Sequence, residues 1–380
     1  SGKSYLLIFQ VKSYMLRDTF FLLPHLLRQR YLYLLLLLLL LLLVQIVGCQ
    51  RWDIDNPYEQ VEWNSYKQYK ANFHTHTTIS DGQLNPHTVV ERYHALGYQV
   101  LAITDHNEVT YPWNEFSAMS PSNRTLDRHK KGNLEEKDLT YHDRNPTALG
   151  MVDIQANELS RHHHTGSFFN DQNGTETEEA SFVSVASKNG LTIFFHPGRY
   201  TERNPGTYTI DWYVDFYERF DHLIGMEIYN QGDRYPGDRQ TYDSVLTRLM
   251  PDRPVWAYSN DDMHTSQTLG RNWNMLLLPV LNHASVRKSM ESGHSFYLYS
   301  PSGHEGPAVP RIEKINVNKF KGIIEIEATG YDSIRWISRG EIIHRGEHLS
   351  LRENPVEQYV RAEIFGPGKT VIGTQPFGIR

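Results

Sequence analysis

The stretch ANFHTHTTISDG, residues 71–82, opens a series of short apolar runs, almost all of which lead into histidine or carboxylate side chains. The later runs are VLAIT (100–104), MVDIQA (151–156), LTIFF (191–195), LIGMEI (223–228) and VWAY (255–258). Polar segments compatible with helices lie between them, at residues 86–96, 178–188 and 242–249. Strands that alternate with helices predict an α/β domain whose sheet is built from parallel βα units.

Potential metal ligands follow these runs. They are His74 and His76, Asp81, Asp105 and His106, Glu158, His196, and Asp262 and His264. In a β/α barrel the C-terminal ends of the strands share one face, and the functional residues gather there. We therefore expect separate segments of the chain to deliver imidazole and carboxylate groups to one place.

The spacing within these motifs has a geometric reason. Alternate residues on a strand point the same way, so His74 and His76 can reach one ion, and Asp262 and His264 repeat that spacing. Imidazole combined with carboxylate suits Zn, Mn or Fe(II). Several ions need a bridging carboxylate, and Glu158 is the best candidate because it lies at a strand end of its own.

Composition limits the kinds of site that the chain can build. Its 380 residues include 19 histidines and a single cysteine. One thiol excludes an internal disulfide framework and a cysteine-rich zinc site, so any metal must be held by imidazole and carboxylate groups. The net charge of −6 argues against a general nucleic-acid-binding surface, and we expect no nucleic-acid partner.

The N-terminal part has the pattern of a secretory signal peptide. The run YLYLLLLLLLLLLV (31–44) follows Arg28 and Arg30 and precedes Ile-Val-Gly-Cys at 46–49. These four residues resemble the bacterial lipobox, which implies that Cys49 is lipidated. The alternative is an uncleaved membrane anchor with an incidental Cys49. Either way, we expect a protein that is exported and anchored to a bacterial membrane, as a lipoprotein on the periplasmic or cell-surface side.

The pattern predicts four parts. Residues 1–48 are expected to form the signal peptide or membrane segment, and residues 49–70 a linker after the lipidated cysteine. Residues 71–300 form the α/β domain, in which the polar segment 119–147 is an inserted surface loop. From about residue 311 short strand-like runs are separated by Gly, Asp or Pro, so residues 311–380 are expected to form a small β-sandwich-like domain.

The motifs FHTHTTISDG, ITDHN, NELS, HPGR and SNDDMH, in this order, resemble those of the PHP (polymerase and histidinol phosphatase) family of metal-dependent phosphoesterases. The resemblance covers roughly residues 71–300. It implies a distorted (βα)7 barrel that holds two or three divalent metal ions, Zn, Mn or Fe, at the C-terminal ends of the strands.

The resemblance also implies a ligand set. The first ion is assigned to His74, His76, Glu158 and Asp262. Glu158 bridges to a second ion, held by His196 and one histidine of the run 162–164, where His164 is favoured over His163. The third ion is assigned to Asp81, His106 and His264. Many family members have histidine where this chain has Asp81, so the assignment of the third ion departs from the family pattern at this residue.

The expected activity is hydrolysis of a small-molecule phosphoester by a metal-activated hydroxide. Glu158 is expected to act as the bridging carboxylate, Asp262 (or His264) to assist protonation of the leaving group, and Arg199 to grip the phosphate. Asp105 is expected to orient a ligand imidazole, and Asn230 to line the substrate pocket.

Two further readings stay open. One is a hydrolase of carboxyl esters or carbamates with the same site, because activated hydroxide does not by itself distinguish a carbonyl carbon from phosphorus. The other is a non-catalytic surface lipoprotein that binds metal or glycan through the C-terminal β-rich domain. Residues 359–364 and 374–377 resemble the tail of secreted, carbamate-hydrolase-like PHP proteins, which supports a small β domain beside the α/β domain. A nuclease is disfavoured by the net charge and the expected export. The sequence makes no prediction of the oligomeric state.

Overall fold

The computed structural model describes residues 29–37, 52–174 and 177–380. The chain divides into two units, Ser1–Arg51 and Trp52–Arg380. In the first unit residues 29–37 are helical. None of the helices in the described ranges combines the length and the apolar character that a membrane crossing requires. Most of the expected signal segment, with Cys49, lies outside the described residues, so its lipidation stays a prediction.

All five apolar runs that follow residue 82 form strands, as predicted. They are β3 (Val100–Ala102), β4 (Val152–Ile154), β7 (Leu191–Phe194), β8 (Leu223–Asn230) and β9 (Trp256–Asn260). The first motif is preceded by β2 (Lys67–Asn72). Strands β2, β3 and β4 pair in parallel, and so do β7, β8 and β9. The parallel βα units of the prediction are therefore present.

Four strands in this part were not predicted, and they make the sheets mixed. They are β5 (Ala156–Leu159), β6 (Thr165–Phe168), β10 (Asn272–Leu278) and β11 (Ser295–Tyr299). Strand β6 is antiparallel to both of its neighbours. Its sequence, TGSF, lacks an apolar run because Gly166 faces the Phe195 ring, which a Cβ atom would approach to 2.4 Å. Close packing therefore requires glycine at this position, and glycine is not typical of strands.

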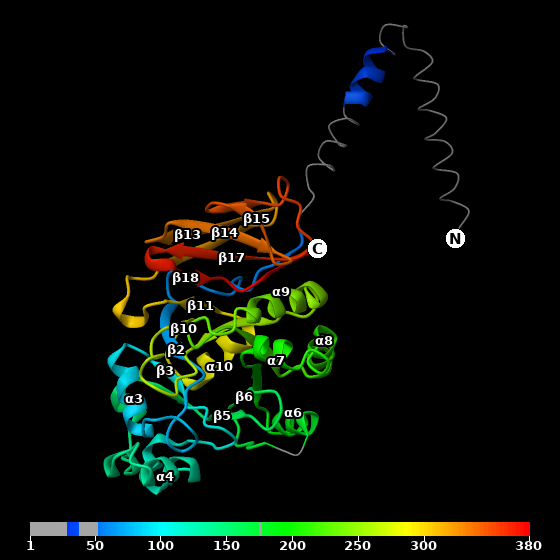
Figure 1. Cartoon of the computed structure of the whole chain (residues 1–380). Helices are drawn as coiled ribbons and strands as arrows, with labels where there is room; N and C mark the ends of the chain where they lie inside the picture. The colour runs from blue at the N-terminus through cyan, green and yellow to red at the C-terminus, as the bar shows by residue number, and fades with distance from the viewer. Residues whose placement is uncertain (1–28, 38–51, 175–176) are drawn as a thin grey trace, which may run out of the picture. The chain divides into compact units, whose positions relative to one another are not determined.

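The strands of the α/β part lie in two sheets. One runs β5-β6-β7-β8-β9, and the other includes β11-β10-β2-β3-β4. Two isolated bridges, Thr75 to Met263 and His106 to Glu158, connect the sheets next to the candidate ligands. Over residues 52–174 and 177–380 the ladders do not close into a barrel. The observed architecture is a mixed α/β fold (Figure 1).

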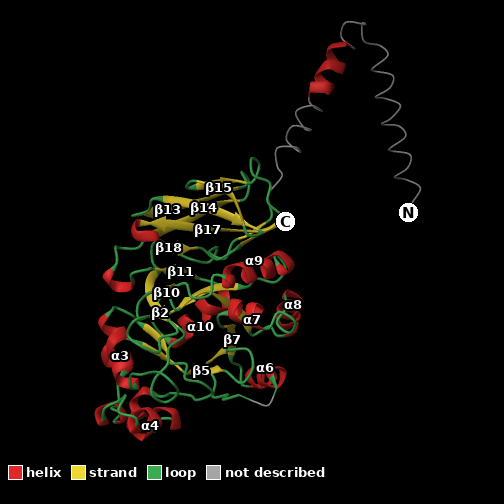
Figure 2. Cartoon of the chain, in the orientation of Figure 1, coloured by secondary structure: helices red, strands yellow, loops and turns green. Residues whose placement is uncertain are grey.

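The three predicted helices are present as α3 (Pro86–Ala95), α6 (Glu178–Ser187) and α9 (Gly237–Leu249). The other helices labelled in Figure 2 are α4 (Asn123–Lys130), α7 (Pro197–Arg203), α8 (Ile210–Arg219) and α10 (His283–Ser292). A further short helix, α5, covers Pro146–Leu149. Short 3-10 turns cover Trp113–Ala118, Glu136–Leu139, Gly303–Glu305 and Pro367–Lys369.

The segment 119–147 was predicted to be a surface loop, but it contains α4. Ser122 caps this helix by accepting a hydrogen bond from the Thr125 amide at 3.2 Å. Arg128 of α4 donates to the Gly82 carbonyl at 2.6 Å, which ties the helix to the turn after His76. Polar contacts rather than an apolar face hold α4, so hydrophobic periodicity gave no sign of it.

The C-terminal region is β-rich, as predicted. One sheet contains β12 (Arg311–Asn318), β13 (Ile323–Thr329) and β16 (His348–Ser350). The facing strands are β14 (Ser333–Ser338), β15 (Glu341–Arg345), β17 (Gln358–Gly366), β18 (Thr370–Gly373) and β19 (Phe377–Ile379). Apolar side chains such as Ile326 and Trp336 form a core between them. Strand β18 pairs with β11, so the sheet continues into the α/β part.

Residues 52–70, which the sequence predicts to be part of a linker, are instead folded. Strand β1 (Ile54–Asp55) pairs with β19. Ile54 and Tyr58 are buried in the same core as the C-terminal strands. The Tyr58 hydroxyl donates to the Ser295 carbonyl at 3.1 Å and accepts from the Gln375 amide at 2.7 Å. A few buried aromatic and aliphatic contacts thus fix a stretch whose composition is polar.

A buried ion-pair network ties β17 to α9 and β11. Arg361, 2% exposed, donates from Nε and Nη2 to the two carboxylate oxygens of Asp243, at 2.9 and 2.7 Å. Its Nη1 donates to Glu363 at 2.7 Å and to the Tyr297 hydroxyl at 3.1 Å. Every donor atom of this guanidinium therefore has a partner.

We expect Arg361→Met to lower the free energy of unfolding by about 3–5 kcal/mol, because it leaves Asp243 and Glu363 buried without their cation. Urea unfolding followed by circular dichroism measures the change. Arg352→Met, at an exposed position of the same region, is the matched control and should stay within about 0.5 kcal/mol of the wild type. Equal effects of the two substitutions would contradict this account.

Candidate metal centre

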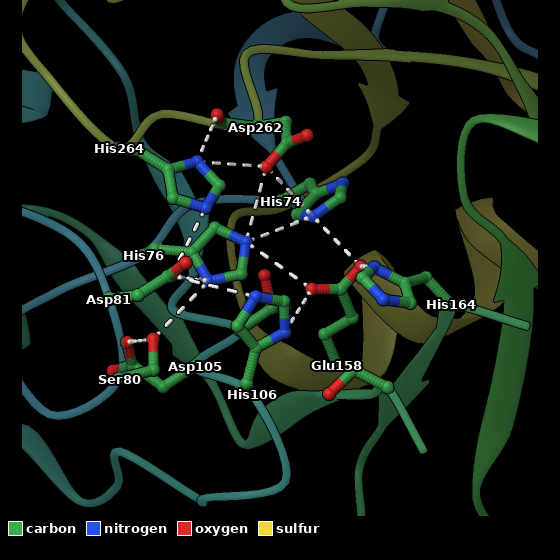
Figure 3. Close-up of polar contacts among 12 residues, drawn as sticks. His74, His76, Ser80, Asp81, Asp105, His106, Glu158, His164, Asp262 and His264 are labelled. Atoms are coloured by element: carbon green, nitrogen blue, oxygen red, sulfur yellow. Dashed lines mark hydrogen bonds and ion pairs between the residues drawn. The ribbon is translucent and has the colours of Figure 1, made fainter. Parts of the chain in front are cut away.

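The nine predicted ligands lie together, and all of them except His196 are labelled in Figure 3. His74, His76 and Asp81 follow β2, His106 follows β3, Glu158 lies on β5, His164 immediately precedes β6, His196 follows β7, and Asp262 and His264 follow β9. Separate segments of the chain thus converge on one place, as their positions after the apolar runs predicted.

His74 and His76 point the same way from the end of β2, as their spacing predicts. Their Nε2 atoms are 3.2 Å apart. Both face Oδ1 of Asp262, at 3.3 and 3.2 Å. They also face the two oxygens of Glu158, at 3.5 and 3.4 Å. Two imidazole nitrogens and two carboxylates therefore surround one point in a fully buried part of the molecule.

Glu158 occupies the middle of the cluster (Figure 3). Its Oε1 lies 2.7 Å from Nδ1 of His164 and 3.5 Å from Nε2 of His196. Its Oε2 lies 2.7 Å from Nδ1 of His106. One oxygen therefore faces His164 while the other faces His106, so the carboxylate presents donor atoms to both sides of the cluster.

Asp81 gathers a second set of imidazoles. Its Oδ1 lies 3.1 Å from Nε2 of His264, 3.5 Å from Nε2 of His106 and 3.7 Å from Nδ1 of His76. Its Oδ2 accepts from Arg124 of α4 at 3.1 Å. Gly82 allows this turn because a Cβ atom there would lie 2.5 Å from the His76 carbonyl oxygen.

The donor atoms fit divalent metal ions. In the described part of the chain, several of their buried atoms make no hydrogen bond, although ion-pair partners lie close to most of them: Asp81 Oδ1, both oxygens of Glu158, Asp262 Oδ1, His106 Nδ1 and His196 Nδ1. Buried polar atoms are normally satisfied, so such a concentration points to a ligand. The ligand atoms form four groups, and within each group all the atoms lie within 4.8 Å of one another. The groups are His76, Asp81, His106 and His264; His74, His76 and Glu158; His74, His196 and Asp262; and His106, Glu158 and His164.

The electrostatics of the cluster also suit a cation. Burial opposes ionisation of Glu158, but His164, His106 and His74 hold the pKa of this carboxyl well below its usual value. Burial likewise opposes protonation of His106, yet Glu158 and Asp81 raise the pKa of this imidazole to about 10. Burial, with His264 and His106 nearby, lowers the pKa of His76 to about 4. The closely packed carboxylates therefore stabilise a positive charge within the site.

Glu227, on β8, is a functional candidate that sequence reasoning missed. Its carboxylate accepts from the His196 amide at 2.9 Å, from Asn230 at 2.9 Å and from Asn260 at 2.8 Å. Its Oε1 also lies 2.9 Å from Nδ1 of His74. Because the other contacts of Glu227 are all with donors, this carboxylate favours a proton on Nδ1 of His74, and in that tautomer Nε2 can present a lone pair to a metal ion in the cluster.

One predicted role needs correction. Asn230 was expected to line the pocket, but it is fully buried and donates to Glu227, which makes it a support for His74.

Asp105 was expected to orient a ligand imidazole, and its contacts agree with that role. It accepts from the Thr77 amide at 2.7 Å and from the Ser80 hydroxyl at 2.5 Å, and Ser80 in turn lies 3.4 Å from Nδ1 of His76. Asp105 therefore acts on His76 through Ser80 and through the turn that carries both residues.

The three consecutive histidines at 162–164 have different surroundings. His164 reaches Glu158, as favoured. His163 is buried against the Tyr200 ring, with centroids 4.1 Å apart, and its Nε2 lies 2.8 Å from the Tyr213 hydroxyl. His162 is exposed. The side chain of His163 therefore belongs to the aromatic core.

A cavity of about 610 Å³ opens over the cluster. Its lining residues are Asp81, His106, Arg124, Glu158, His164, His196, Arg199, Arg203, Gln231, Arg234, Tyr235, Asp262, His264, Thr265, Gln267 and Thr268. Arg199 lines it, as its predicted role requires. Three other arginines of the lining were not predicted from the sequence: Arg124, Arg203 and Arg234. Two of them could have been predicted, because Arg203 follows Arg199 by one helical turn and Arg234 lies shortly after the end of β8.

Comparison with known proteins gives a family match. Residues 72–342 match the family model described as the PHP domain. No curated protein matches the chain.

Solved structures show remote likenesses. A two-domain protein from Bacteroides vulgatus, which contains a predicted PHP-like metal-dependent phosphoesterase, is 15% identical with a TM-score of 0.47, and the match covers 87% of this chain and 100% of that one. The lesion-specific endonuclease EndoQ from Pyrococcus furiosus is 13% identical with a TM-score of 0.37, covering 59% and 56%. An amidohydrolase from Chromobacterium violaceum is 14% identical with a TM-score of 0.33, covering 52% and 88%.

We expect Glu227→Gln to weaken metal binding by about 10–100-fold, since an amide group would turn N–H atoms toward partners that are themselves donors. Competition with a chromophoric chelator measures the dissociation constants. Glu325→Gln, at an exposed position on β13, is the matched control and should bind metal like the wild type. Unchanged affinity in the Glu227 variant would show that this carboxylate does not orient a ligand.

Proposed function

The chain belongs to the PHP domain family, and from this premise we propose that it is a metal-dependent phosphoesterase that hydrolyses a small-molecule phosphoester. The observation that supports this proposal best is the buried cluster of imidazole and carboxylate groups at the base of an arginine-lined cavity. The finer assignment, two or three Zn, Mn or Fe ions bridged by Glu158, is part of the same proposal.

Divalent ions in such a cluster lower the pKa of a water molecule toward neutrality and so supply hydroxide. The chain's own residues hold the substrate. Arg199 lines the cavity three residues after His196, and its guanidinium can bind two phosphate oxygens at once. There it would offset the charge that builds on the phosphoryl group during attack.

Asp262 is held in one orientation by a neighbour. Gln231 donates from Nε2 to Oδ2 of Asp262 at 3.0 Å and to its backbone carbonyl at 3.1 Å. The other oxygen, Oδ1, faces His74 and His76. Because both oxygens are engaged, we assign Asp262 mainly the role of a ligand rather than that of a free acid.

The size of the cavity favours a small substrate. Its volume of about 610 Å³ falls in the range of about 300–1,000 Å³ that is typical of small-molecule sites. The polar lining, with four arginines, favours an anionic ester over an apolar one. These features support a phosphoester over a carboxyl ester or carbamate, which the same ions could also hydrolyse.

Export and lipid attachment at Cys49 remain part of the proposal. They are supported by the apolar run at 31–44 and the residues Ile-Val-Gly-Cys that follow it. Cys49→Ala should move the protein from the membrane pellet to the soluble fraction after expression in a bacterium, whereas an uncleaved anchor would leave it in the pellet.

The direct test is hydrolysis of phosphomonoesters, phosphodiesters and carboxyl esters by the metal-loaded protein. We expect turnover of at least one phosphoester, and a fall in kcat of about 10²-fold in Arg199→Gln, because one group that stabilises developing charge is lost. Arg287→Gln, which removes a guanidinium paired with Glu291 outside the cavity, is the control and should keep full activity.

Hydrolysis of a carboxyl ester or carbamate with no turnover of any phosphoester would overturn the proposal. So would the absence of all turnover with each of Zn, Mn and Fe.

A further inference from the structure

The charge of the cavity exceeds what a single phosphate group requires. Three carboxylates line it, Asp81, Glu158 and Asp262, and all three belong to the candidate ligand groups. Four guanidiniums line it as well. Each divalent ion adds two further positive charges, so the loaded site has a large excess of positive charge and favours a substrate with more than one anionic group.

The four arginines are not equivalent. Arg124 is paired with Asp81 at 3.1 Å. Within residues 52–174 and 177–380, Arg199, Arg203 and Arg234 have no carboxylate within ion-pair distance, so their charge is available to a ligand. Arg199 and Arg203 lie one turn apart on α7, and Arg199 is the nearer of the two to His196 along the chain. Arg203 is therefore available to a second group of a substrate in the same cavity.

Arg234 is linked to the cluster by hydrogen bonds. Its Nη1 donates to Oε1 of Gln231, and its guanidinium lies over the Tyr235 ring at 5.3 Å from the centroid. Gln231 in turn donates to the Asp262 carboxylate at 3.0 Å. The chain from Asp262 through Gln231 to Arg234 holds an exposed guanidinium at the wall of the cavity, where an unconstrained arginine would be free to extend into solvent.

The excess of arginine is confined to one side. A second cavity, of about 690 Å³, shares Asp81, His106 and Arg124 with the first. Its other lining residues include Ile79, Val109 and Met119, and Arg124 is the single basic residue of its described lining apart from His106. The anionic part of a substrate is thus directed toward α7 and the residues that follow β8.

We propose that the substrate carries a second anionic group, a phosphate or a carboxylate, which Arg203 and Arg234 bind while Arg199 faces the reacting phosphate. Guanidinium pairs with either group through two parallel hydrogen bonds. The inference rests on the proposed function, because it defines the class of phosphoester that the same site accepts.

Binding of non-hydrolysable probes to the metal-loaded full chain tests it by isothermal titration calorimetry. The probes are propylphosphonate, propane-1,3-diphosphonate and 4-phosphonobutanoate. Each has a phosphonate on a three-carbon chain, and the far end of that chain carries no second anion, a phosphonate or a carboxylate, respectively. We expect the wild type to bind the diphosphonate at least about tenfold more tightly than propylphosphonate. A gain for 4-phosphonobutanoate as well would identify a site for either anion, and a gain for the diphosphonate alone would identify a second phosphate.

The double variant Arg203→Gln with Arg234→Gln should lose this preference, to within about twofold, because its fall in affinity for the diphosphonate exceeds any fall for propylphosphonate. Arg248→Gln is the matched control, because Arg248 is exposed and paired with Asp211 outside this cavity. Equal affinities of the wild type for all three probes would overturn the inference, as would an equal loss for all three in the double variant.

These outcomes are distinct from failure of the proposed function. If phosphoesters are hydrolysed but the probes bind equally, the second-anion site is wrong and the activity stands. If no phosphoester is hydrolysed but the diphosphonate is preferred and the preference depends on Arg203 and Arg234, the anion site stands and the activity is wrong.

Discussion

A fully buried carboxylate, Glu158, is the constraint on which the site depends. An ionised carboxylate is costly to bury unless charged or hydrogen-bonding partners compensate it. Here His164 and His106 each lie 2.7 Å from one of its oxygens, with His196 and His74 at 3.5 Å. Because these partners come from separate segments, the ends of the strands must meet at this point for the carboxylate to be tolerated.

The irregular features of the fold bring these strand ends together. The β5–β6 hairpin places Glu158 opposite Gly166, and so brings His164 back over the carboxylate. The isolated bridge between His106 and Glu158 fixes the adjoining strand end. Glu227 then connects His74 to the amide of His196 and holds both in place. A strictly parallel sheet would lack the hairpin and the histidine that it carries.

The sequence predicts this site better than it predicts the architecture around it. Alternation along a strand places His74 and His76 on one side, so local geometry was enough for that pair. Strand β6 gave no signal, because Gly166 is there to admit the Phe195 ring, a contact between segments distant in sequence. The same holds for Glu227, since its role depends on neighbours from β7 and β9 that no local pattern reveals. Helix α4 and Arg124 were missed because polar contacts hold them, and the linker was misjudged because Tyr58 is fixed by residues more than 200 positions away.

The central claim is that this buried cluster binds several divalent ions, and metal analysis of the purified chain tests it most directly. Inductively coupled plasma mass spectrometry, with protein concentration from amino-acid analysis, should give at least two tightly bound ions per chain. Glu158→Gln, which keeps the shape of the side chain but removes its charge, should lose at least one of them. Fewer than two ions in the wild type, or an unchanged number in the variant, would contradict the account.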